Sequence, residues 1–206
     1  MKKHGFLLCL LCSICCFATA SSAVVIDFET LAHNDDLIID HGAIYAEDGF
    51  LLTNTATEQS SGFSPSLATL GEQVYGYASS TMLFNDNSDG LTLLTRIGGG
   101  EFRLNSVSLA ELFPLDEAFD VIFTGLLSDG STISATFALD GALGIETFSF
   151  SPDFTHLVSV GWNQTGYYHQ FDNLDVNPVP EPATVWLLGL GLIITYGWRR
   201  KIHKSA

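Results

Sequence analysis

Two carboxylates, Glu29 and Asp172, are the residues whose types and positions best suit a metal site. Asp172 has the strand parity of Leu174 and Val176, so we expect it on the core side, where an unpaired charge costs several kcal/mol. Calcium would supply the partner, with backbone carbonyls completing about six to eight oxygen ligands. Glu29 has the opposite strand parity from Phe28, so it could share an ion with Asp172 only at a bulge or at the end of its strand. The prediction is a structural Ca²⁺ at Glu29 and Asp172; exposed carboxylates are the alternative.

A second acidic stretch, residues 85–90, has oxygen side chains at alternate positions before Gly90. This order resembles the start of an EF-hand-type calcium loop. However, Asn85 occupies the first position, and Arg96 stands where such a loop has a bidentate Glu. We therefore interpret the stretch as a turn rich in Asn and Asp.

Aromatic and polar residues gather between Trp162 and His169, where they could form a carbohydrate surface. Such surfaces need aromatic faces for stacking and polar groups that bond hydroxyls, here Asn163, Gln164 and His169. Trp162 alternates with Val158 and Val160 and is expected in the core. Tyr167 and Tyr168 fall in a predicted loop and are the candidate glycan contacts.

Enzyme signatures are missing from the sequence. Residues 62–66 place Ser66 where a nucleophile elbow requires glycine, and the histidines lack zinc-ligand spacing. No catalytic residue and no cofactor other than calcium is therefore expected. Because acidic residues are plentiful, a pair of glycosidase carboxylates remains the alternative.

The charge balance argues against nucleic acid as a partner. The chain has 206 residues and a net charge of −15. Residues 21–179 carry only Arg96 and Arg103 against 22 acidic residues, a net charge of −20. Such a surface repels phosphate backbones and suits a hydrated layer, cationic partners or divalent metals, with simple solubility as the alternative.

Period-two alternation predicts an antiparallel β-sandwich for residues 21–177, with a jelly roll as the expected topology. Asp129-Gly130 separates two alternating runs and predicts a hairpin. A phase slip between Leu104 and Val107 predicts a bulge. The other expected strands are 25–30, 49–53, 91–97, 101–112, 146–150, 156–162 and 169–176.

The N-terminal end has the features of a secretory signal peptide. Lys2 and Lys3 precede a short apolar stretch, and Ala18-Thr19-Ala20 offers a cleavage site. The predicted signal is residues 1–20, or to residue 23 if the second small-residue site is used. All four cysteines lie within it, so the processed protein would contain no thiol.

The C-terminal end, residues 178–206, combines a helix breaker, an apolar helix and a basic stop. Pro180-Glu181-Pro182 comes first, and residues 183–198 form the predicted transmembrane helix, about 24 Å long. The basic stop is Arg199, Arg200 and Lys201, which would stay on the cytoplasmic side.

This order resembles the PEP-CTERM sorting signal of Gram-negative bacteria. The resemblance implies recognition of Pro180, Glu181 and Pro182 by a membrane-embedded, exosortase-type cysteine transpeptidase. The chain would be exported through the inner membrane, anchored there transiently, cleaved, and passed to the cell surface or extracellular matrix. The body resembles, through short segments such as 27–29 and 169–174, the jelly-roll domains of such cargo and carbohydrate-binding modules.

The function expected from these features is a non-catalytic surface or matrix protein that binds or structures exopolysaccharide. Two alternatives are a secreted carbohydrate-active enzyme, glycosidase or lyase, on the same fold, and a structural protein that self-associates.

Overall fold

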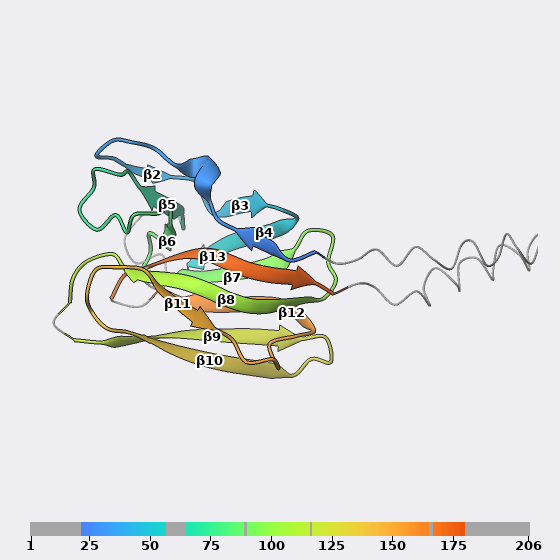
Figure 1. Cartoon of the computed structure of the whole chain (residues 1–206). Helices are drawn as coiled ribbons and strands as arrows, with labels where there is room; N and C mark the ends of the chain where they lie inside the picture. Colours follow the sequence, from blue (N-terminus) through green and yellow to red (C-terminus); the bar gives the residue numbers. More distant parts are fainter. Residues whose placement is uncertain (1–21, 57–64, 89, 116, 165–166, 180–206) are drawn as a thin grey trace, which may run out of the picture. The chain divides into compact units, whose positions relative to one another are not determined.

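The structure is a computed structural model that describes residues 22–56, 65–88, 90–115, 117–164 and 167–179. Ser22–Val179 is one compact unit of the chain (Figure 1). The predicted signal peptide, Pro180-Glu181-Pro182, the apolar helix 183–198 and the basic stop (Arg199, Arg200, Lys201) lie outside the described residues. Within the described residues, no helix is long and apolar enough to span a membrane.

The described body consists of strands and a single turn of 3-10 helix. The elements are β1 (Val24–Ile26), η1 (Glu29–Leu31), β2 (Ile38–Asp40), β3 (Ile44–Glu47), β4 (Phe50–Ala56), β5 (Leu67–Leu70), β6 (Leu83–Asn85), β7 (Gly90–Arg96), β8 (Phe102–Glu111), β9 (Phe119–Leu127), β10 (Thr132–Leu139), β11 (Glu146–Ser149), β12 (Leu157–Asn163) and β13 (His169–Pro178).

All strand pairs are antiparallel, and they divide into two layers. One layer has the order β2-β5-β6-β13-β8, with β1 on β13 and β11 on β8. The other has the order β3-β4-β7-β12-β9-β10. A single pair, Leu157 with Phe102, joins them through β12 and β8. The predicted all-β, antiparallel sandwich is confirmed.

The predicted hairpin is present as β9 and β10. Inward residues of β9 are buried and outward ones exposed along almost its whole length, as period-two alternation requires. Gly130 closes the turn with φ of 87°, and the amide and hydroxyl of Ser131 both donate to Asp129 Oδ1, at 2.8 and 2.6 Å. A glycine is needed here because other residues rarely adopt a positive φ.

Two bulges set the phase of the β8–β13 ladder. Asn105 is the extra residue in β8, between pairs Asp175–Ser106 and Val176–Leu104, which confirms the predicted bulge. The second bulge, which was not predicted, lies in β13 at Asn173, whose φ is 48°. Because of it, Asp172 and Leu174 lie on opposite faces of β13 and the predicted shared parity is wrong, although Asp172 is fully buried, as expected.

The core between the layers is rich in phenylalanine and contains Trp162, which is 1% exposed. The Trp162 ring lies 4.9 Å from the ring centroids of both Phe123 and Phe171. Burial of each such side chain stabilises the fold by about 1.5–3 kcal/mol. A smaller apolar cluster, defined here as the second cluster, consists of Ala68, Leu70, Phe84 and Leu112.

The sequence-based strands differ from the structure mainly near the N-terminus. The predicted strand 25–30 ends at Ile26, because Phe28 adopts φ of 55° and Glu29 begins η1. Strands β2, β3, β5 and β6 were missed because each has only three or four residues. Such short segments show too few alternations for a period to be recognised.

Candidate functional site

The loops around residues 75, 113 and 167 lie at one end of the sandwich, on the left in Figure 1. Along the β8–β13 ladder, Glu111 pairs with His169 at this end, and Phe102 pairs with Pro178 at the other. At about 3.3 Å per residue, the two ends lie roughly 30 Å apart. Val179, the last described residue, follows Pro178 at the opposite end.

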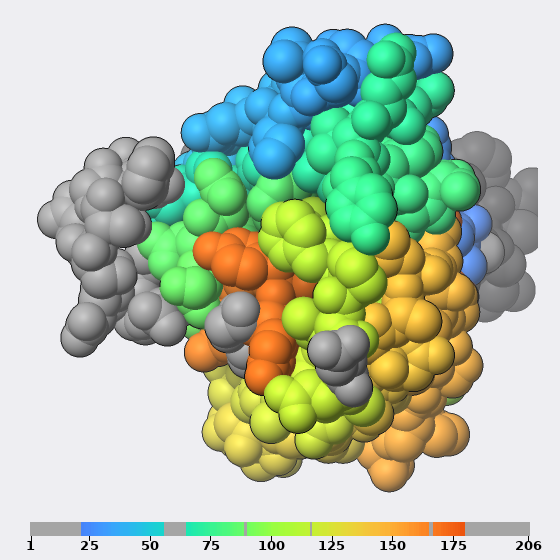
Figure 2. All heavy atoms as spheres, turned by 90° about the vertical axis from the view of Figure 1, so that its left-hand side faces the viewer, coloured from blue at the N-terminus to red at the C-terminus, as the bar shows by residue number. Residues whose placement is uncertain are grey.

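Three exposed aromatic residues, defined here as the aromatic end face, lie on adjoining segments of this end: Tyr75 (68% exposed), Phe113 (51%) and Tyr167 (41%). The segments touch because the Leu112 amide donates to Tyr168 O at 3.0 Å and Gln170 Nε2 donates to Gly76 O at 2.8 Å. Figure 2 shows the three segments side by side. The sequence alone did not bring Phe113 or Tyr75 together with Tyr167, since their proximity depends on tertiary contacts.

The two predicted glycan contacts have different environments. Tyr167 is exposed, its hydroxyl donates to Glu117 Oε1 at 2.5 Å, and its ring lies 5.5 Å from that of Phe119. Tyr168 is only partly exposed and packs against the second cluster. Glycan contact by either residue stays a prediction, and the more open ring is that of Tyr167.

Two of the predicted polar neighbours are buried beneath this end and do not lie on the surface. Gln164 is 2% exposed and His169 is fully buried. Within the described part of the chain, neither side chain has a hydrogen-bond partner. Burial lowers the pKa of His169 to about 4, so its ring is neutral at physiological pH.

Glu29 and Asp172, the predicted calcium ligands, are brought together through one hydroxyl. Ser80 Oγ lies within hydrogen-bond distance of both, 3.2 Å from Glu29 Oε1 and 2.7 Å from Asp172 Oδ2. The amide and side chain of Asn173 also donate to Asp172, at 2.6 and 2.8 Å. Glu29 lies in η1, beyond the end of β1. Its side chain can therefore approach Ser80 and Asp172 even though its strand parity would have pointed it the other way.

Asp172 is fully buried, yet it sits among hydrogen-bond donors. Burial raises its pKa from 3.8 to about 6; the nearby charge of Glu29 adds to the shift, while hydrogen bonds from Ser80 and Asn173 oppose it. These oxygen ligands would suit Ca²⁺. Calcium binding by Glu29 and Asp172 stays a prediction.

A different acidic group, which was not predicted from the sequence, could hold a metal ion. It consists of Glu111, Asp140 and Glu146, which come from the ends of three strands. No spacing in the sequence marks it, because the three residues meet only when β8, β10 and β11 are folded.

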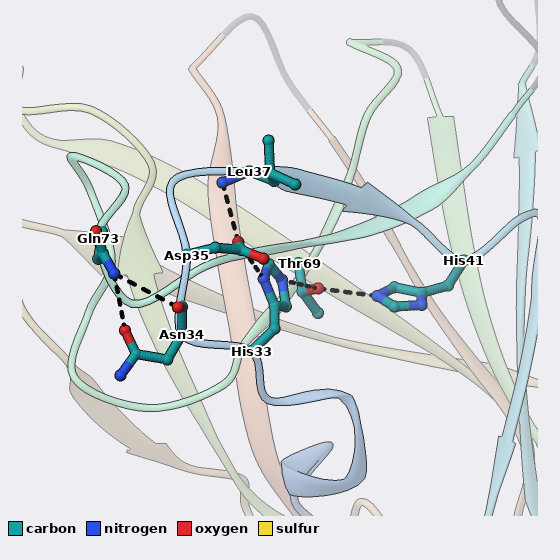
Figure 3. Close-up of polar contacts among 7 residues, drawn as sticks. All are labelled: His33, Asn34, Asp35, Leu37, His41, Thr69 and Gln73. Carbon is teal, nitrogen blue, oxygen red and sulfur yellow. Dashed lines mark hydrogen bonds and ion pairs between the residues drawn. The ribbon is translucent and has the colours of Figure 1, made fainter.

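A chain of polar contacts links the 33–41 segment to β5 (Figure 3). Asp35 Oδ1 lies 2.7 Å from His33 Nδ1, and Thr69 Oγ1 lies 3.1 Å from His33 Nε2 and 2.8 Å from His41 Nε2. The bond to His33 lowers the pKa of Asp35. The order carboxylate, imidazole, hydroxyl is that of an acyl-transfer relay, but Thr69 is fully buried and offers no accessible nucleophile.

Residues 86–88 bend between β6 and β7, and the Gly90 amide donates to Asn87 O at 2.9 Å, as expected for the turn interpreted from the sequence. Asn85 is 1% exposed, and its Oδ1 accepts bonds from Asn54 Nδ2 at 2.7 Å and from the Asn87 amide at 3.0 Å. Its oxygen is therefore engaged within the protein.

Comparison with known proteins identifies the C-terminal region. The family model of the PEP-CTERM protein-sorting motif matches residues 178–201, so the chain carries this signal, which indicates export, membrane-anchored sorting and processing by an exosortase. No curated protein matches the chain significantly.

Several solved carbohydrate-binding modules resemble the body. A family 29 module from Piromyces equi is 6% identical, covering 77% of this chain and 91% of its own, with a TM-score of 0.42. The xylan-binding CBM22-1 domain of Paenibacillus barcinonensis Xyn10C is 14% identical, covering 80% of this chain and 99% of its own, with a TM-score of 0.39. The family 32 module of C. perfringens NanJ, in complex with galactose, is 9% identical, covering 66% of this chain and 98% of its own, with a TM-score of 0.36. These distant likenesses transfer no residue or ligand to this chain.

Proposed function

We propose that this chain is an exported, non-catalytic surface or matrix protein that binds exopolysaccharide through its aromatic end face. Residues 1–20 would direct export, residues 21–177 would form the binding body, and residues 178–206 would direct sorting through Pro180-Glu181-Pro182 and the apolar helix 183–198. An exosortase-type transpeptidase would then release the body to the cell surface or extracellular matrix.

The observation that carries this proposal is the position of the exposed rings. Tyr75, Phe113 and Tyr167 are exposed on adjoining loops, roughly 30 Å from the end of the sandwich at Pro178. A ligand could thus reach them while the other end remains near the point of attachment. Sugar rings stack on aromatic faces through their C–H surfaces, and carboxylates accept bonds from sugar hydroxyls.

The acidic character of the body favours a neutral sugar or one bridged by cations. Residues 21–179 carry a net charge of −20, and Glu117 lies beside the Tyr167 ring. An anionic polymer would be repelled unless divalent cations lay between the two.

The direct test is titration of the purified full chain with the polysaccharide of the producing cells, in calcium and again in chelator. We expect saturable binding that Tyr167→Ala and Phe113→Ala weaken several-fold. Ile97→Ala is the matched control, because Ile97 is also exposed (54%) but lies at the opposite end. Equal binding by all variants would contradict the aromatic end face, and a shortened polymer would contradict a non-catalytic role.

The sorting part of the proposal has a separate test. Replacing Pro180, Glu181 and Pro182 by alanine should leave the chain uncleaved in the inner membrane, as judged by fractionation and size on a gel. Normal delivery of this variant to the surface would contradict the proposed sorting route.

A further inference from the structure

The acidic group at the end of the sandwich brings three carboxylates close together. One oxygen each from Glu111, Asp140 and Glu146 lies within 4.8 Å of the other two. Oxygens that bind one Ca²⁺ at about 2.4 Å are separated by at most about 4.8 Å, so this spacing is compatible with one shared ion. Without a cation, three carboxylates at this spacing repel one another.

The deepest member of the group has an unsatisfied oxygen. The side chain of Glu111 is fully buried, and while its Oε1 accepts the Gly141 amide at 2.7 Å, its Oε2 has no hydrogen-bond partner in the described residues. A buried, unpaired carboxylate oxygen costs several kcal/mol. Burial and the charges of Glu146 and Asp140 also raise the pKa of Glu111.

The backbone of the β10–β11 turn orients the group. Three consecutive amides each donate to one carboxylate: Asp140 to Glu146 at 3.3 Å, Gly141 to Glu111 at 2.7 Å, and Ala142 to Asp140 at 2.8 Å. The carbonyl oxygens of Glu117 and Leu115 approach Gly141 so closely that a Cβ there would lie 2.8 and 3.0 Å from them. Carbonyl oxygens of Leu115 and Glu117 thus lie beside this turn.

From this arrangement we infer that Glu111, Asp140 and Glu146 form a binding site for a divalent cation, with Ca²⁺ as the preferred ion. The ion would satisfy the buried oxygen of Glu111 and neutralise most of the charge of the three carboxylates. All three ligands are hard oxygen atoms without nitrogen or sulfur, which favours calcium over zinc or copper.

The bound ion would fasten the end of the sandwich that carries the aromatic end face. It would tie together β8, the β10–β11 turn and the start of β11. The same turn contacts the 115–117 segment, since Leu115 donates to Gly141 O at 2.8 Å. Glu117 of that segment accepts the bond from Tyr167. The inference itself does not depend on sugar binding.

The test uses the full chain, purified in mild detergent and treated with chelator, titrated with CaCl₂ in a calorimeter and followed by thermal unfolding. We expect saturable binding and a rise in Tm of about 5–10 °C when calcium exceeds the Kd about a hundredfold. Glu146→Gln and Asp140→Asn should each weaken calcium binding by at least about tenfold. Both residues are more exposed than Glu111, so neither substitution disturbs the core.

Two controls separate this site from the rest of the acidic surface. Asp153→Asn changes an exposed carboxylate elsewhere, and the double variant Glu29→Gln/Asp172→Asn removes the other predicted calcium pair. Both should bind calcium at the Glu111 group as the wild type does.

Three outcomes would overturn the inference: no calcium binding, binding unchanged in Glu146→Gln and Asp140→Asn, or binding lost only in the double variant. Saturable binding of Mg²⁺ without Ca²⁺ would overturn the preferred ion. Because the probe is calcium alone, these results do not depend on whether the protein binds polysaccharide.

Discussion

The two acidic regions of this sandwich differ in how their buried carboxylates are satisfied. Asp172 is fully buried but receives bonds from Ser80 Oγ, the Asn173 amide and Asn173 Nδ2. Glu111 is equally buried, but its Oε2 receives no bond from the described residues, and its carboxylate lies close to those of Asp140 and Glu146.

The contrast shows that burial of a carboxylate does not by itself indicate a metal. Where the fold supplies hydroxyl and amide donors, the charge or its protonated form is accommodated by the protein alone. Where an oxygen of a buried carboxylate lacks a donor and further acids lie close by, a cation is the partner that we propose.

The largest effect is expected from Gly141→Ala, which would disrupt the turn of the Glu111 group. Gly141 has φ of 87° and would place a Cβ 2.8 Å from Glu117 O, so we expect a loss of about 3 kcal/mol. Stabilisation by calcium should disappear with it. Gly130→Ala is the matched control, since Gly130 has the same φ but no atom within 4 Å of its Cβ. Denaturant unfolding of both variants checks this, and equal losses would contradict it.

The next effect concerns pH and the Asp172 region. The folded pKa of Asp172 is raised to about 6, so its contribution to stability is complete below pH 3.8 and is lost as the pH rises through 6. In chelator, the stability of Asp172→Asn relative to wild type should therefore increase by about 2 kcal/mol between pH 4 and pH 7.5. His169 is present in both proteins, so its own contribution to the pH dependence of stability, which has the opposite sign, cancels in the difference. A constant difference across this range would show that Asp172 titrates normally.

Ser80→Ala would remove the hydroxyl donor shared between Glu29 and Asp172, and so make the Asp172 region more like the Glu111 group. We expect a loss of about 1–2 kcal/mol at neutral pH, because Asp172 would lose a bond in a buried position. Ser134→Ala, in an exposed Ser–Thr pair, should change stability little. If calcium restores the lost stability of Ser80→Ala, the predicted ion at Glu29 and Asp172 gains support; no restoration argues against it.

The smallest effect is expected from Glu111→Gln, and its sign should depend on calcium. In chelator the neutral side chain should stabilise the protein by about 1 kcal/mol, because one of three repelling charges is removed. In excess calcium it should be less stable than wild type. Paired thermal unfolding curves test this, and destabilisation under both conditions would indicate that Glu111 is needed as an ion pair or hydrogen-bond partner instead.

Local patterns in the sequence predicted much of the fold. The β9–β10 hairpin followed from alternation around Asp129-Gly130, and the bulge at Asn105 followed from a phase slip. The bulge at Asn173 was not predicted because no local pattern marks it, and it reversed the side of the strand on which Asp172 lies.

The candidate sites could be predicted only in part. Tyr167 was chosen because it stands in a loop between two strands, whereas Tyr75 and Phe113 come from distant segments and join it only through contacts near Leu112. The Glu111 group lies at the ends of three strands. Because the chain has 23 acidic residues, an acidic residue near a strand end gives no signal in the sequence.

The sequence by itself determined the features that depend on neighbours along the chain: the all-β alternation, the acidic charge and the sorting motif at residues 178–201. Only the tertiary structure decided which carboxylates are buried and what surrounds them. Strand periodicity tells which residues face inward, but the register of β8 against β13 and β11 tells which donors or further acids they meet there. That register depends on bulges and on packing between residues far apart in the chain.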